Sequence, residues 1–112
     1  MNGKNFSYDE YSDSLIVSNR AENESVKSNF ELGDIIFSLT GKGKIVAIEI
    51  RGFSSFLESC NIDTKIIDNL KNVELNIVPK KDTIFFILKI KSLNMEEIVS
   101  KDIPFIMPLI NQ

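Results

Sequence analysis

Two alternating runs on either side of a glycine-containing segment decide the fold: Ile35-Ile-Phe-Ser-Leu39, Thr40-Gly-Lys-Gly-Lys44 and Ile45-Val-Ala-Ile-Glu-Ile-Arg51. Apolar side chains recur at every second position in both runs, which is typical of a β-strand with one buried face. A short loop containing glycine between two such runs indicates a hairpin. The centre of the chain is therefore predicted to be antiparallel β-structure.

The same alternation predicts strands before and after this hairpin. Polar or glycine-containing turns separate them, and the chain from Ile103 is expected to be extended, because Pro104 and Pro108 disfavour a helix interior and a central strand. The further strands are expected over 5–9, 14–18, 26–32, 73–79, 83–91 and 95–101.

The period changes between Phe53 and Leu70, where apolar residues follow helical spacing. Phe53, Phe56, Leu57 and Cys60 fall on one helical face, which predicts one short helix. A second helix is predicted from Thr64 to Leu70, with Asp63 as its N-cap. We expect these helices to cover a sheet face and to bury Phe56 and Ile67.

These elements predict the α+β class: an antiparallel β-meander sheet with one or two short helices packed on it. A length of 112 residues predicts a single domain over 1–112, made of a meander and helix (6–60) and a C-terminal helix and β-hairpin extension (61–112). The inward faces are expected to carry Leu15, Val17, Val46, Ile48, Ile50, Leu75, Ile77, Ile84, Phe86 and Leu88.

Composition narrows the classes of function. The chain has no histidine, which removes the commonest general base and most zinc sites. Its net charge of -3 disfavours general phosphate binding. The single Cys60 cannot form an internal disulfide, and no apolar run is long enough to span a bilayer or to form a secretory signal. A cytoplasmic protein without membrane contact, cofactor or metal is expected.

The N-terminal half resembles a known family. Three runs followed by a short helix carry the resemblance: Tyr8-Asp-Glu-Tyr-Ser-Asp-Ser-Leu-Ile16, Gly33-Asp-Ile-Ile-Phe37 and Gly43-Lys-Ile-Val-Ala-Ile-Glu-Ile50. This order is similar to domain of unknown function 2283, a widespread prokaryotic family, over about residues 6–60. Ala47 departs from the glycine that the family often has there. The resemblance implies a compact β-meander closed by a helix, with no established activity. Some members are encoded beside small toxin-like proteins, so it also implies a protein partner.

Carboxylates are the candidate site residues, and Tyr8, Asp9, Asp13 and Glu49 all fall in the family-like motifs. Asp9, Glu10 and Asp13 cluster in one turn, where they either bind a divalent cation or, more commonly, hold their own backbone amides. Glu49 lies in an apolar strand and is either a general base or, preferably, a cross-strand partner of Arg20, Arg51 or a lysine.

Two other features have structural interpretations that we prefer. Gly41-Lys-Gly-Lys44 lies between two strands and lacks the full P-loop pattern, so a hairpin turn is preferred over a phosphate site. Cys60 falls at a helix end with no histidine to activate it, so a structural role is preferred over a nucleophilic one.

Lys80, Lys81, Lys89 and Lys91 form a basic cluster on the Lys80–Lys91 hairpin. Lys89 and Lys91 share a strand face with Phe85, and such a ribbon can stack on single-stranded nucleic acid. The overall acidity of the chain makes nucleic-acid binding a minor alternative.

Strand 83–91 is apolar on both faces, which predicts burial on both sides. The apolar tail adds to this surface, and we expect either the tail to fold over the strand or a second copy to cover it in a homodimer. The candidate interface residues are Phe85, Ile87, Phe105, Ile106, Met107, Leu109 and Ile110.

No nucleophile, base and oxyanion set is present, so the preferred function is a non-catalytic interaction or oligomerisation module with no catalytic residue. The alternative is a small ligand-binding or metal-binding protein or an enzyme that uses Glu49 and Asp9/Asp13. A deep pocket lined by Glu49 would favour the alternative, and a flat apolar patch would favour the module.

Overall fold

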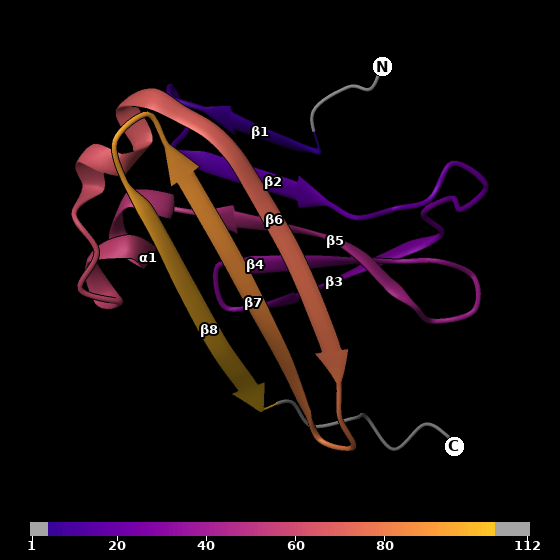
Figure 1. Ribbon diagram of the computed structural model, residues 1–112. Helices are drawn as coiled ribbons and strands as arrows, with labels where there is room; N and C mark the ends of the chain where they lie inside the picture. The colour runs from indigo at the N-terminus through magenta and orange to yellow at the C-terminus, as the bar shows by residue number, and fades with distance from the viewer. Residues whose placement is uncertain (1–4, 105–112) are drawn as a thin grey trace.

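The computed structural model describes residues 5–104, which form eight β-strands, one α-helix and one 3-10 helix (Figure 1). The α+β class and the dominance of antiparallel strands are confirmed. The elements are β1 (Phe6–Asp9), β2 (Ser14–Ser18), β3 (Ser28–Leu32), β4 (Ile35–Leu39), β5 (Ile45–Arg51), α1 (Phe53–Ser59), η1 (Thr64–Asn69), β6 (Leu70–Pro79), β7 (Thr83–Ser92) and β8 (Glu96–Pro104).

The strands divide between two sheets instead of forming one meander. The first sheet has the order β1-β2-β5-β4-β3 and the second has the order β6-β7-β8, with all neighbours antiparallel. Strand β2 pairs with β5, and the polar segment after β2 carries the chain across to β3 at the far edge. Alternation shows which face of a strand is buried but not which strand lies beside it, so the sequence pattern did not reveal this order.

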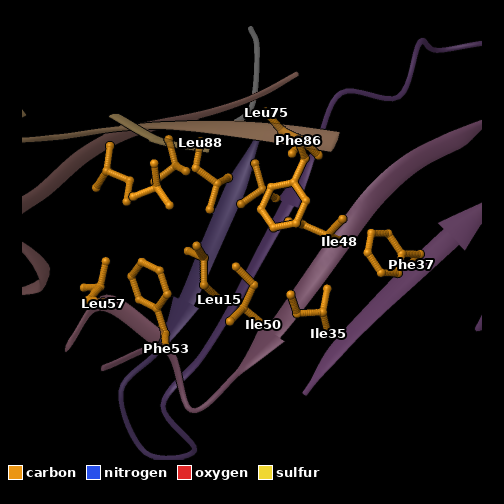
Figure 2. Packing of buried hydrophobic residues seen from close by; sticks show 14 of the residues in the cluster. Leu15, Ile35, Phe37, Ile48, Ile50, Phe53, Leu57, Leu75, Phe86 and Leu88 are labelled. Carbon is orange, nitrogen blue, oxygen red and sulfur yellow. The ribbon is translucent and has the colours of Figure 1, made fainter. Parts of the chain in front are cut away.

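The two sheets pack face to face and enclose the core. In Figure 1 the β6–β8 sheet crosses the five-stranded sheet obliquely. Figure 2 shows Phe86 and Leu88 of β7 pointing from above toward Leu15, Ile48 and Ile50. The rings of Phe37 and Phe86 meet edge to face with centroids 6.5 Å apart. Burial of each such side chain contributes about 1.5–3 kcal/mol relative to exposure.

Nine of the ten residues predicted to face inward are buried: Leu15, Val17, Val46, Ile48, Ile50, Leu75, Ile84, Phe86 and Leu88. Ile77 is only half-buried, so its prediction is corrected. It lies near the β6–β7 turn, which projects past the five-stranded sheet (Figure 1) and therefore has less of that sheet beneath it.

The helices pack at one end of the two sheets, and the second sheet takes the covering position that the helices were expected to occupy (Figure 1). Phe53, Leu57 and Ile66 are the buried helical residues, whereas Phe56 and Ile67 are only half-buried, which corrects that prediction. Helix α1 starts at Phe53, so Phe53 and Leu57, one turn apart, face the core and Phe56 lies at their flank. Asp63 caps η1 as predicted and accepts a hydrogen bond from the Lys65 amide at 2.9 Å.

Candidate functional sites

A hydrogen-bonded group of Tyr8, Asp13 and Ser54 joins the β1–β2 turn to the start of α1. The Tyr8 hydroxyl donates to Asp13 Oδ1 at 2.6 Å, and the Ser54 hydroxyl donates to Asp13 Oδ2 at 2.6 Å. The Ser54 amide lies 3.2 Å from both carboxylate oxygens, and the Phe53 amide donates to the Asp13 carbonyl at 2.9 Å. Asp13 adopts φ 56°, a conformation that aspartate tolerates better than most residues. We call this group the latch.

The latch sets the protonation of its two titratable members. Burial, followed by the hydrogen bond to Asp13, raises the pKa of Tyr8 to about 12. Burial acts to raise the pKa of Asp13, but the hydrogen bonds from Ser54 and Tyr8 outweigh it and lower the pKa below its ordinary value. Near neutral pH the Tyr8 hydroxyl therefore donates to an ionised Asp13 carboxylate.

Asp9 also holds its own turn. Its carboxylate accepts from the Tyr11 amide at 3.1 Å and from the Ser12 hydroxyl at 2.9 Å. Among residues 5–104 there is no group of three or more Asp, Glu, Cys or His side chains placed to hold a metal ion. Asp9 thus accepts a backbone amide of its own turn, whereas Asp13 accepts the amide of Ser54 in α1, and the Glu10 side chain makes no hydrogen bond with any other residue in 5–104.

Glu49 lies away from the latch, on the outer face of the five-stranded sheet. It is half-buried on the central strand β5, between Ile16 of β2 and Ile36 of β4. The expected cross-strand ion pair is not formed: Arg51 pairs with Glu31, and Glu49 makes no hydrogen bond or ion pair with any other described residue. Strand β2 lies between Glu49 and Asp9, and Asp9 lies in register with Arg51, two residues along β5 from Glu49. The two carboxylates therefore do not form a joint site.

An open groove of about 540 Å³ lies between the two sheets beside α1. Apolar side chains dominate its lining, with Arg51 and Lys101 as its cations and Asp34 as its carboxylate. Neither Glu49, Asp9 nor Asp13 lines it, so it lacks the feature that would favour the enzyme or ligand-binding alternative. The apolar lining residues are Leu32, Ile35, Ile50, Phe56 and Ile103.

Gly41–Lys44 forms the hairpin turn that was preferred over a phosphate site. The Thr40 amide donates to the Lys44 carbonyl at 2.9 Å, and β4 and β5 follow directly on either side. Cys60 is half-buried at the C-cap of α1, at the helix end predicted for it.

Carboxylates on β8 pair with two of the four lysines of the basic hairpin. Lys89 lies 3.6 Å from Glu96, and Lys80 lies 3.8 Å from Asp102. The Lys80 ammonium also lies 5.0 Å from the centroid of the Phe85 ring, on the face where a base would stack. These contacts weaken the case for nucleic-acid binding at this hairpin.

The outer face of the β6–β8 sheet carries an apolar patch formed by Val78, Phe85, Ile87 and Ile98. Phe85 and Ile87 are half-buried, Val78 is 48% exposed and Ile98 is 65% exposed. Val78 is the register partner of Phe85, so the patch runs across neighbouring strands. The sequence pattern identified Phe85 and Ile87 and missed Val78 and Ile98. The other candidate interface residues, 105–110, lie outside the described part of the chain.

Comparison with known proteins confirms the resemblance over one segment. Residues 5–54, a little under half of the chain, match the model of a family described as protein of unknown function (DUF2283). This segment contains β1–β5, Gly52 and the first residues of α1, including all of the latch, Glu49 and the whole five-stranded sheet. No curated protein matches the chain, and no solved structure matches it. Within residues 5–104 there is no helix of the length and apolarity needed to cross a membrane.

Proposed function

We propose that this protein is a non-catalytic interaction module that self-associates through its C-terminal three-stranded sheet. The observation that carries the proposal is the apolar patch on the outer face of β6–β8, with Ile98 at the edge strand. An apolar patch on a small domain marks a surface that another protein covers.

The charges around the patch favour a second copy as the partner. Three lysines (Lys80, Lys89, Lys91) and three carboxylates (Glu74, Glu96, Asp102) occupy this face, so it is balanced and can be complementary to itself. The outer face of the other sheet carries Asp9, Glu31 and Glu49 against Arg51, and would repel its own copy. The C-terminal sheet is therefore the self-associating surface.

Light scattering coupled to size-exclusion chromatography tests the proposal. The wild-type chain is expected to show twice its 12.7 kDa mass at micromolar concentration. Ile98→Lys is expected to shift it toward monomer, whereas Ile16→Lys, at an exposed position on the other sheet, leaves the dimer intact. A wild-type mass of 12.7 kDa that persists on concentration contradicts the proposal.

A further inference from the structure

Within residues 5–104, strand β8 is an edge strand of its sheet. It pairs with β7 on one side, and no described strand pairs with its other edge. The opposite edge of the same sheet is protected, because β6 packs beside β2 and the Leu75 carbonyl accepts a hydrogen bond from the Asn19 side chain at 3.3 Å. An unprotected edge is a template for pairing with another chain.

The space beside this edge is open. A second groove, of about 310 Å³, lies between residues 97–101 of β8 and Cys60, Asn61 and Ile62 at the end of α1. It shares Lys101 with the larger groove, so the two grooves follow β8 along most of its length. Figure 1 shows β8 as the strand of its sheet on the side of α1.

The hairpin geometry shows which backbone groups face this edge. The Ser92 amide donates to the Met95 carbonyl at 2.8 Å, which makes these two residues a hydrogen-bonded pair. Hydrogen-bonded and non-hydrogen-bonded pairs alternate along an antiparallel ladder, and the β7–β8 register runs without a bulge. Glu97, Val99 and Lys101 therefore direct their backbone groups toward β7, while Ile98 and Ser100 direct theirs toward the open edge.

Two opposite charges on β8 have no ionic partner in the described part of the chain. Glu97 and Lys101 are half-buried on the inner side of the strand and form no ion pair with any residue in 5–104. Lys101 instead lies 5.8 Å from the centroid of the Phe56 ring. Four residues of strand separate the two side chains by about 13 Å, so they cannot pair within one strand.

We propose that two copies of the chain pair antiparallel through their β8 edges, with the two Val99 residues facing each other across the twofold axis. This register joins Ile98 to Ser100 of the second copy as hydrogen-bonded pairs. It places Glu97 opposite Lys101 of the second copy, twice by symmetry, and Met95 opposite Ile103. The result is one continuous sheet of six strands, β6-β7-β8 from each copy.

Other twofold registers that satisfy the same backbone hydrogen-bond pattern pair the side-chain charges less well. A register centred on Ser100 places Glu97 opposite Ile103, and a register centred on Lys101 places the two lysines opposite each other. The proposed register also brings like charges together twice by symmetry, with Glu96 opposite Asp102 of the second copy. Each of these carboxylates already has its own lysine, Lys89 or Lys80, so the repulsion is offset.

This pairing rests on the self-association proposed above, but it uses the edge of the C-terminal sheet, so the outer faces of the two copies lie side by side and do not cover each other. A charge exchange on β8 tests it. Glu97→Lys and Lys101→Glu each place like charges opposite each other twice, so each is expected to raise the dimer dissociation constant by about tenfold or more. The double variant restores the opposite charges and is expected to return the constant to within about threefold of wild type. Glu22→Lys, at an exposed position between β2 and β3 and outside the C-terminal sheet, is the matched control and leaves the constant unchanged.

A cross-link at the twofold axis gives a second readout. In a Cys60→Ser background, Val99→Cys places two thiols at a non-hydrogen-bonded antiparallel pair, where Cα atoms lie about 4.5 Å apart, within disulfide range. Mild oxidation is expected to give a covalent dimer. A different result would contradict the β8 pairing: the chain dimerises, the charge exchange does not change the dissociation constant, and no covalent dimer forms. If Phe85→Lys then dissociates the dimer, the two sheets pack by their outer faces. A chain that stays monomeric overturns both proposals.

Discussion

Tyr8 and Asp13 are linked across the β1–β2 turn by a hydrogen bond of 2.6 Å between the phenol and the carboxylate. The same carboxylate accepts from the side chain and amide of Ser54, so one aspartate connects the first hairpin to the start of α1. The link spans 41 residues between Asp13 and Ser54. The link lies within residues 5–54, the segment that matches the family, and it joins the two ends of that segment.

Loss of the Asp13 carboxylate is expected to destabilise the fold. Asp13→Ala removes the acceptor of three donors, which are the Tyr8 hydroxyl, the Ser54 hydroxyl and the Ser54 amide. Hydrogen bonds to a charged group contribute about 1.5–3 kcal/mol each when well shielded. Because the latch is only partly buried, we expect a fall of about 2 kcal/mol in the free energy of unfolding, measured by urea denaturation. Glu10→Ala, at an exposed position in the same turn, is the control and should leave stability unchanged.

The latch also predicts how stability depends on pH. The pKa of Tyr8 is raised in the folded state, so its contribution is fully present below the ordinary tyrosine pKa of about 10 and is lost as pH rises through about 12. The pKa of Asp13 is lowered, so its contribution is present at neutral pH and is lost as pH falls below its ordinary value. Phenolate absorbance should place one of the two tyrosines near pH 12, and Asp13→Asn should lower that value toward 10. Two tyrosines that both titrate near pH 10 would contradict the latch.

The strand positions could be predicted from the sequence because alternation reports burial directly. Eight predicted strands are present, although β3 starts at Ser28 and β8 extends to Pro104. Strand β6 starts at Leu70, where the second helix was predicted to end, and not at Val73. The division into two sheets could not be predicted, since it depends on which strands meet after the chain has crossed the core. Pro104 is tolerated because β8 is an edge strand, where a missing amide costs no ladder hydrogen bond on the open side.

The candidate site was predictable only in part. The motif identified Tyr8 and Asp13, but no local pattern indicated that Ser54, 41 residues further on, completes the group. The lack of an ion-pair partner for Glu49 among the described residues could not be predicted either. Arg51, on the same strand as Glu49, has a second carboxylate within reach, Glu31, and pairs with it. Contacts that join distant segments depend on the fold, and sequence spacing does not report them.

The inter-sheet core gives a prediction of large effect. Phe86 is fully buried and its ring meets Phe37, so Phe86→Ala leaves a cavity between the sheets. Loss of a buried phenylalanine costs about 3–5 kcal/mol. Urea denaturation should show this loss, or an unfolded chain. Val78→Ala, at a half-exposed position on the outer face, should cost less than about 1 kcal/mol, and equal effects would contradict the arrangement of the sheets.

Gly52 connects β5 to α1 with φ 67°, in the left-handed region. An added Cβ would meet no atom within 4 Å, so the cost of Gly52→Ala is backbone strain alone, about 1–2 kcal/mol. Gly41→Ala is the matched control, since that glycine lacks a positive φ and its added Cβ would lie at an ordinary 3.5 Å from Lys27. Thermal unfolding should therefore show a lower midpoint for the first variant only. If Gly41→Ala lowers the unfolding midpoint by as much as Gly52→Ala, the positive φ of Gly52 is not the cause of the loss.

Glu49 gives the last prediction, because it is a half-buried carboxylate on a central strand without a partner among the described residues. A β-branched residue between Ile16 and Ile36 would add apolar contact and remove the cost of partly desolvating a charge. Glu49→Val is therefore expected to raise the free energy of unfolding by about 0.5–1 kcal/mol, measured by urea denaturation. Glu31→Val, on the same row of the sheet but in an ion pair with Arg51, should give no gain. A loss of stability in Glu49→Val would mean that the carboxylate supports the fold, whereas a gain would show that stability does not explain its presence.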